Sequence, residues 1–314
     1  MVKAGLILCT AMLAASISFS RWEEIATLPT PLAGGYGFAD HDQVMYAGGS
    51  TWRNGVKEYR ADVHVYDGKL LQWRSMPSLP LALAYGAAVM TSQGPEILGG
   101  VNGDRVSRQI LRFEPKSNGW REFGMLPADS LLSRAEVVGD EVLLFGGCQD
   151  LADLTGCSDA VWSRDLHGKW KRVASLPHGP LAVAASAVLG RSVYLFGGCS
   201  MPRAGEVVNH DEAWKFDMST HQWKQLRSMP HAARSLAAIA LDDHRVLLAG
   251  GYHGDFSAAV LIYDATLDRY SEAPSLPLAA ANVTLIRSMN KIFSLGGEDR
   301  MKSRTPRAFT AILN

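Results

Sequence analysis

The chain of 314 residues lacks most of the features that would assign it quickly to a function class. It carries no net charge at neutral pH, because 31 Lys and Arg balance 31 Asp and Glu. Such a chain has no excess of positive charge that would attract nucleic acid and no basic tract that would bind anionic lipid. It has no glycine-rich phosphate loop, and no His and Cys residues stand at the spacing of metal ligands. We therefore expect no nucleic-acid partner, no metal and no cofactor.

Cysteine is scarce, with four residues in the whole chain. Cys9 lies in the apolar N-terminal segment, which leaves Cys148, Cys157 and Cys199 for the rest of the protein. An odd number of cysteines does not make a disulfide framework. Cys148 and Cys157 stand nine residues apart in one loop, so they can bridge it in an oxidising compartment or remain as thiols. The sequence leaves both possibilities open.

Long hydrophobic runs are absent except at the N-terminus. Met1-Val2-Lys3 is short and positive, residues 5–19 carry no charge, and small serines precede Arg21. This pattern predicts a secretory signal peptide over residues 1–20. A membrane anchor and a buried first strand are the alternatives, but the run is short for a spanning helix. We expect a periplasmic or secreted protein that has no membrane contact after cleavage near Ser20.

Glycine and tryptophan, in contrast, recur with a fixed period. Six Gly-Gly pairs end apolar runs at intervals of 46 to 53 residues, and an aromatic residue precedes the first glycine of each pair by 26 or 27 positions. A proline follows each aromatic residue by seven positions. The pairs begin at Gly48, Gly99, Gly146, Gly197, Gly250 and Gly296, and the aromatic residues are Trp22, Trp73, Trp120, Trp170, Trp223 and Tyr270. Three markers in register six times indicate a structural repeat.

Each repeat contains four short apolar and polar segments that are separated by turn residues. In the fourth, strands are expected at 182–188, 192–196, 211–217 and 222–226. Four strands about every 50 residues are typical of a propeller blade, and the Gly-Gly and aromatic pattern resembles the kelch repeat. We predict an all-β protein in which residues 21–314 form a single six-bladed kelch-type β-propeller.

The two ends of the chain complement each other. The sixth repeat has segments for three strands and then stops, whereas residues 21–27 form an unassigned strand before the first repeat. We expect this N-terminal strand to complete the last blade and close the ring, because closure removes exposed strand edges.

The loops that follow the Gly-Gly pairs are expected to meet at one end of the central channel, which is the default place for a site. In five repeats the residue after the pair is Ser50, Val101, Cys148, Cys199 or Tyr252. In the sixth it is Glu298, and Arg304-Thr305 follows six residues later. A solvated polar loop is the simpler interpretation of this segment.

The run Gly-Gly-Glu298, five residues and Arg304-Thr305, ending at Phe309, is similar to the signature of the bacterial N-acetylneuraminate epimerases, or sialic acid mutarotases. The resemblance implies an exported six-bladed kelch propeller that interconverts the α and β anomers of sialic acid without a cofactor. It implies that Glu298 is the general base and that Arg304 binds the substrate. The motif lies in the last blade here and centrally in the best-known members, which implies a circular permutation.

The implied chemistry suits these residue types. A single carboxylate can relay a proton between the anomeric hydroxyl and the ring oxygen, and an arginine fork matches a carboxylate. The expected partner is therefore a small sugar acid. Weaker candidates for substrate binding, at the starts of inner strands or in loops at the same end, are Arg134, Arg234, Asn282 and His253.

A non-catalytic kelch module is the main alternative. Kelch folds carry many functions, so a propeller that binds a protein or glycan through the same loops fits the fold equally well. A copper radical oxidase and a neuraminidase are disfavoured, because the sequence has no copper-ligand pattern and no Asp-box repeats.

Overall fold

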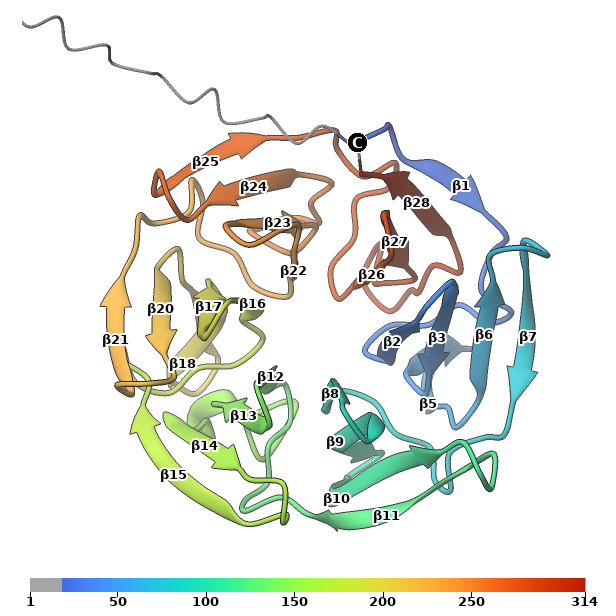
Figure 1. The fold of residues 1–314 in the computed structure, drawn as a ribbon, viewed down its shortest axis with the longest axis horizontal. Helices are drawn as coiled ribbons and strands as arrows, with labels where there is room; N and C mark the ends of the chain where they lie inside the picture. Colours follow the sequence, from blue (N-terminus) through green and yellow to red (C-terminus); the bar gives the residue numbers. More distant parts are fainter. Residues whose placement is uncertain (1–18, 314) are drawn as a thin grey trace, which may run out of the picture.

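The computed structural model describes residues 19–313, which form six antiparallel four-stranded sheets around a central axis (Figure 1). The predicted six-bladed propeller is confirmed. Residues 1–18, which carry most of the predicted signal peptide, lie outside the described residues. Among the described residues, no helix is long and apolar enough to cross a membrane.

The blades follow the chain in order, each with its first strand nearest the axis (Figure 1). Blade 1 contains β2 (Tyr36–Asp40), β3 (Gln43–Ala47), β6 (Val63–Asp67) and β7 (Gln72–Met76). Blade 2 contains β8 (Ala87–Thr91), β9 (Gly94–Asn102), β10 (Arg105–Glu114) and β11 (Gly119–Met125). Blade 3 contains β12 (Arg134–Val138), β13 (Glu141–Phe145), β14 (Ala160–Arg164) and β15 (Trp170–Ser175).

The second half of the ring repeats this arrangement. Blade 4 contains β16 (Ala185–Leu189), β17 (Ser192–Phe196), β20 (Ala213–Asp217) and β21 (Gln222–Gln225). Blade 5 contains β22 (Ala237–Ala240), β23 (Arg245–Ala249), β24 (Val260–Asp264) and β25 (Arg269–Glu272). Blade 6 contains β26 (Thr284–Ser288), β27 (Lys291–Leu295), β28 (Ala308–Ile312) and β1 (Glu23–Ile25).

The N-terminal strand closes the ring, as the missing fourth strand of the last repeat predicted. β1 pairs with β28, and Glu24 accepts two hydrogen bonds from Arg307, at 2.8 and 2.9 Å. The pairing continues toward the N-terminus, where Phe19 bridges Leu313 and is buried. The folded ring therefore includes Phe19 and Ser20, which precede the expected cleavage point.

The Gly-Gly pairs allow neighbouring blades to touch through their backbones. Gly48 and Gly296 have φ of +61° and +58°, a region that favours glycine. A Cβ on Gly48 would lie 2.5 Å from the carbonyl oxygen of Leu83, and one on Gly296 would lie 2.4 Å from that of Leu32. In both cases the oxygen belongs to the next blade around the ring, so no side chain fits.

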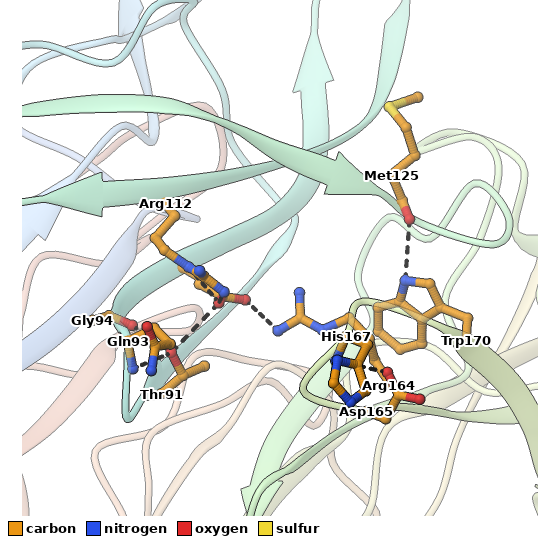
Figure 2. Close-up of polar contacts among 10 residues, drawn as sticks. Thr91, Gln93, Gly94, Arg112, Met125, Arg164, Asp165, His167 and Trp170 are labelled. Atoms are coloured by element: carbon orange, nitrogen blue, oxygen red, sulfur yellow. Dashed lines mark hydrogen bonds and ion pairs between the residues drawn. The ribbon is translucent and has the colours of Figure 1, made fainter.

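The periodic aromatic residues lie on the outer strands and reach the preceding blade. Trp73 donates a hydrogen bond to the carbonyl of Ala26, and Trp170 donates one to that of Met125 (Figure 2). Between blades 2 and 3 the fully buried carboxylate of Glu96 also accepts hydrogen bonds from Arg112 and Arg164. These contacts join consecutive blades into one ring.

Two of the expected loops after the Gly-Gly pairs are hairpins. β4 (Ser50–Arg53) pairs with β5 (Val56–Tyr59) beside blade 1, and β18 (Cys199–Arg203) pairs with β19 (Glu206–Asn209) beside blade 4. The corresponding loop of blade 3 contains a short 3-10 helix, η1 (Leu154–Gly156), and is closed by a Cys148–Cys157 disulfide. Of the two possibilities for these cysteines, the structure shows the bridge.

Candidate functional site

A ring of six backbone positions surrounds the central channel at the end where the Gly-Gly loops lie. Each position belongs to the inner loop, which is the loop that leads into the innermost strand of a blade, and each has a left-handed backbone conformation with φ between +49° and +67°. The six residues are Gly34, Tyr85, Leu132, Val183, Ser235 and Asn282. Only glycine adopts this conformation freely, so five of the six positions store backbone strain.

Hydrogen bonds join this ring from blade to blade. The N–H of Tyr85 donates to the carbonyl of Gly34, and the same pattern continues through the next four positions, with lengths of 2.8 or 2.9 Å. The further donor–acceptor pairs are Leu132 to Tyr85, Val183 to Leu132, Ser235 to Val183 and Asn282 to Ser235. Strain at each position is thereby offset by a contact with the neighbouring blade.

The ring lies at a cavity of about 220 Å³ in the channel. Small residues of the innermost strands, including Gly37, Ala88 and Ala237, leave this space open. Two charged residues of β12, Arg134 and Glu136, also line the cavity. The cavity is therefore polar on the side of blade 3.

Glu136 is an acid that the sequence analysis did not select. Burial raises the pKa of Glu136 to about 7, although a 2.6 Å hydrogen bond from Ser186 and the charge of Arg134 lower it. Arg134 itself donates to the backbone carbonyl of Ala184 in blade 4. The signal was present in the sequence, since Glu136 occupies the third position of an innermost strand. The other five blades have Phe38, Val89, Ala187, Ile239 and Ile286 there.

Glu298 and Arg304, the two residues singled out as catalytic, lie side by side at the same end of the ring. The backbone of Glu298 pairs with that of Ala281 through two hydrogen bonds of 2.8 and 2.9 Å, and Ala281 precedes the ring residue Asn282. The Oε1 of Glu298 forms an ion pair with Nη1 of Arg304, at a distance of 2.9 Å. The side chain of Arg304 is only 2% exposed and that of Glu298 is 21% exposed. A ligand can therefore reach the carboxylate more readily than the guanidinium.

Both terminal nitrogens of Arg304 have partners, whereas its buried Nε has none among the described residues. Nη1 also donates to the carbonyl of Ser303 at 2.7 Å, and Nη2 donates to the hydroxyl of Tyr85 at 3.0 Å. Burial alone would lower the pKa of Arg304, but Tyr85 and Glu298 raise it above its usual value. The guanidinium is thus a permanent cation that holds Glu298 in place.

Tyr85 links this pair to the cavity, and sequence reasoning missed it. Its hydroxyl lies 2.7 Å from the Oγ of buried Ser50, and the residue lines the channel cavity. Neither Glu298 nor Arg304 is among the lining residues. The only sequence signal for Tyr85 is a large aromatic residue where other inner loops have small or aliphatic ones.

An aromatic and cationic cluster lies beside Tyr85. The ammonium of Lys57 lies 5.3 Å from the ring centre of Tyr85 and 5.5 Å from that of Trp52 in β4. Lys302, in the same loop as Arg304, lies 5.8 Å from the Trp52 ring. Within residues 19–313 neither lysine has an ion-pair partner, so both charges are available to an anion.

The remaining sequence candidates divide between the cavity and the periphery. Arg134 and Asn282 line the cavity. Arg234 and His253 do not: Arg234 donates to Asn209 at 2.6 Å and stacks on Tyr252, whereas His253 stacks on His231. No group of His, Cys, Asp and Glu side chains that could hold a metal ion exists in the described part of the chain.

Comparison with known proteins gives the same architecture. A model of the Kelch motif matches residues 184–230. Kelch-like protein 25 of Xenopus tropicalis is 29% identical over 80% of this chain and 42% of its own length. N-acetylneuraminate epimerase of Yersinia pestis is 26% identical over 46% of this chain and 47% of its own length. The chain thus spans less than half of the length of these curated relatives.

Among solved structures, one described as "Structure of YjhT" superposes with a TM-score of 0.75. The match covers 90% of this chain and 95% of the other at 15% sequence identity. At this identity the match supports the fold alone. Taken together, the chain is a kelch-type propeller that resembles the sialic acid mutarotases.

Proposed function

We propose that the protein is an N-acetylneuraminate epimerase, an isomerase that interconverts the α and β anomers of sialic acid without a cofactor. The observation that carries this proposal is the Glu298–Arg304 ion pair, which directly follows the sixth Gly-Gly pair at the ring of inner loops. A carboxylate that is positioned but partly exposed suits proton transfer to and from a bound sugar. The partial match to an epimerase adds support.

In this mechanism Glu298 accepts the proton of the anomeric hydroxyl on C2. The C2 oxygen becomes a ketone, the bond from C2 to the ring oxygen breaks, and the ring oxygen takes the proton back from Glu298. Rotation about the C2–C3 bond exposes the other face of the ketone, and the same steps in reverse close the ring. The proton is conserved, so no external acid or redox partner is needed.

Arg304 acts in this proposal by positioning Glu298. Its terminal nitrogens are engaged by Glu298, Ser303 and Tyr85, so a substrate carboxylate must compete with partners already in place. Lys57 and Lys302 supply the positive charge that remains for that carboxylate, and Trp52 offers a flat surface between them. The role of Arg304 as a direct substrate ligand stays a prediction.

We further propose that the protein is exported, so that it meets its substrate in the periplasm or outside the cell. The Cys148–Cys157 bridge supports this location, because disulfides persist in oxidising compartments. Sequencing of the N-terminus of protein expressed with its leader tests the proposal. A first residue near Arg21 is expected, and an intact Met1 on cytosolic protein would overturn it.

The test of the enzymatic function is proton NMR of freshly dissolved α-N-acetylneuraminate. The protein should speed the approach to the α/β equilibrium without changing the final ratio. A rate equal to that of spontaneous mutarotation would refute the epimerase function.

A non-catalytic kelch module is the second candidate. The similarity to Kelch-like protein 25, which covers 80% of the chain, favours it, as do the exposed apolar side chains of Val56, Val207 and Val208 on the two hairpins. Such a module would bind a protein or glycan and leave the anomer exchange rate unchanged.

A further inference from the structure

The ring of inner loops is interrupted at one position only among the described residues. Five of its six blade-to-blade steps carry a hydrogen bond, and the sixth would join the N–H of Gly34 in blade 1 to the carbonyl of Asn282 in blade 6. Neither of these two groups has a hydrogen-bond partner in the described chain. The sixth step therefore presents one free donor and one free acceptor.

This interruption is local, because blades 6 and 1 are firmly joined around it. The N–H of Gly297 donates to the carbonyl of Leu32 at 2.9 Å, and that of Leu28 donates to Pro306 at 2.8 Å. The innermost strands also touch, since a Cβ on Gly37 would lie 2.4 Å from a methyl of Thr284. A loose ring closure does not explain the free groups.

The free groups are also accessible. Gly34, Leu132 and Asn282 are partly exposed and line the channel cavity, whereas the ring residues Tyr85, Val183 and Ser235 are at most 9% exposed. Gly34 has no side chain of its own, and the ring of Tyr85 packs beside it. An unpaired backbone donor and acceptor require a partner, which is water in the empty site and a polar group of a ligand in the occupied one.

The position matches the proposed reaction site. Asn282 follows Ala281, which bridges Glu298, and the Tyr85 ring packs so closely on Gly34 that a Cβ there would lie 2.5 Å from it. Tyr85 in turn binds Arg304. The free groups thus adjoin the residues that hold Glu298.

We propose that Gly34 and Asn282 bind the secondary amide of an N-acylated sugar acid, with the amide C=O accepting from the Gly34 N–H and the amide N–H donating to the Asn282 carbonyl. A secondary amide carries one donor and one acceptor, as each peptide unit of the ring does, and so continues the same pattern of hydrogen bonds. This inference rests on the proposed function for the sugar, and it names the group by which the site selects its substrate.

A small-molecule test separates this inference from the epimerase function. N-methylacetamide is titrated into [15N]glycine-labelled protein, and N,N-dimethylacetamide, which keeps the carbonyl but has no N–H, is the matched control. We expect N-methylacetamide to shift the Gly34 amide resonance saturably and to bind at least about 10-fold more tightly than the control. Equal affinities, or an unmoved Gly34 resonance, would overturn the inference.

The corresponding sugar test compares N-acetylneuraminate with the analogue that has a hydroxyl in place of the acetamido group. The acetamido sugar should bind at least about 10-fold more tightly, because the analogue cannot satisfy both backbone groups in the same way. Asn282→Gly keeps the backbone carbonyl and tolerates the left-handed φ, so it should preserve the ratio of the two sugar affinities. Ser235→Gly, at a hydrogen-bonded step of the ring, is the control and should preserve the same ratio. Loss of the ratio in Asn282→Gly alone would assign the selection to the side chain instead.

The outcomes distinguish the two proposals. If the anomer exchange rate is unchanged but the amide probe binds at Gly34, the epimerase function fails and the amide site stands. If exchange is accelerated but both sugars bind equally, the function stands and the amide site fails.

Discussion

The guanidinium of Arg304 in blade 6 donates a 3.0 Å hydrogen bond to the hydroxyl of Tyr85, which precedes the innermost strand of blade 2. The two residues are 219 positions apart in sequence, and blade 1 stands between their blades. Because Arg304 also pairs with Glu298, the proposed base is positioned by a residue from another repeat. The site is therefore a property of the closed ring.

Removal of the Tyr85 hydroxyl should loosen this arrangement. Tyr85→Phe keeps the ring that packs on Gly34 but removes the hydroxyl that contacts Nη2 of Arg304 and the Oγ of buried Ser50, so unfolding should become easier by about 1–2 kcal/mol. The anomer exchange rate should fall because Glu298 is held less firmly. Chemical denaturation and proton NMR measure the two effects. Tyr59→Phe, on a neighbouring strand, is the control, and wild-type values for both variants would show that the hydroxyl is dispensable.

Replacement of the proposed base gives the sharpest catalytic test. Glu298→Gln preserves the size and the contact with Arg304 but cannot accept a proton, so the exchange rate should drop by about 100- to 10,000-fold. Sugar binding, measured by titration calorimetry, should persist. Asp299→Asn changes the next carboxylate and should exchange anomers at nearly the wild-type rate. A Glu298→Gln variant as fast as wild type would assign the base elsewhere.

The role of Arg304 can be separated into positioning and substrate binding. Arg304→Lys keeps the charge but cannot contact Glu298 and Tyr85 together through a planar fork. If Arg304 positions Glu298, the maximal exchange rate should fall more than sugar affinity, and Lys57→Gln with Lys302→Gln should show the opposite pattern. If Arg304→Lys chiefly weakens binding, the residue is a substrate ligand, as the family resemblance implies.

Glu136 predicts a pH dependence of stability. Burial raises the pKa of its carboxyl to about 7 in the folded protein from an ordinary value of 4.5. The native state then binds a proton that the unfolded chain releases between these pH values. The stability that Glu136 contributes is complete below pH 4.5 and is lost as the pH rises through 7.

Glu136→Gln should remove this dependence. Relative to wild type, the variant should gain stability between pH 5 and pH 8, by about 3 kcal/mol at the upper end. Denaturation series at several pH values measure the gain. Ser186→Ala removes a hydrogen bond that lowers the pKa of Glu136, so the pKa of that carboxyl should rise further and the loss of stability with pH should extend to a higher pH than in wild type. A pH-independent difference between Glu136→Gln and wild type would contradict the raised pKa.

The disulfide of blade 3 should stabilise the folded ring. The double variant Cys148→Ser/Cys157→Ser should lose about 2–3 kcal/mol, as expected for closure of a loop of this length. Thermal unfolding with and without reductant measures the loss. Unchanged stability after reduction would show that the bridge is unimportant.

Burial raises the pKa of the Cys199 thiol to about 11, so native protein should resist alkylation at this residue.

The sequence alone determined the fold. Glycine, aromatic residue and proline stand in register six times, and several of the glycine and aromatic positions contact the neighbouring blade. Gly296 lets blade 6 touch Leu32, and Trp73 reaches the backbone of the preceding blade. Even the closure of the ring was predictable, because the last repeat lacks the strand that residues 23–25 supply. Periodic patterns are local, so one sequence suffices to reveal them.

Only the tertiary structure decided the composition of the candidate site. Glu298 and Arg304 are close in sequence and were found there, but Tyr85 joins them from another blade, and Glu136 meets Ser186 across a blade boundary. The free groups of Gly34 and Asn282 have no sequence signal at all, since a missing backbone hydrogen bond depends on how the first and last blades meet. Contacts between repeats follow from the curvature of the closed ring, and that curvature is a property of the folded chain.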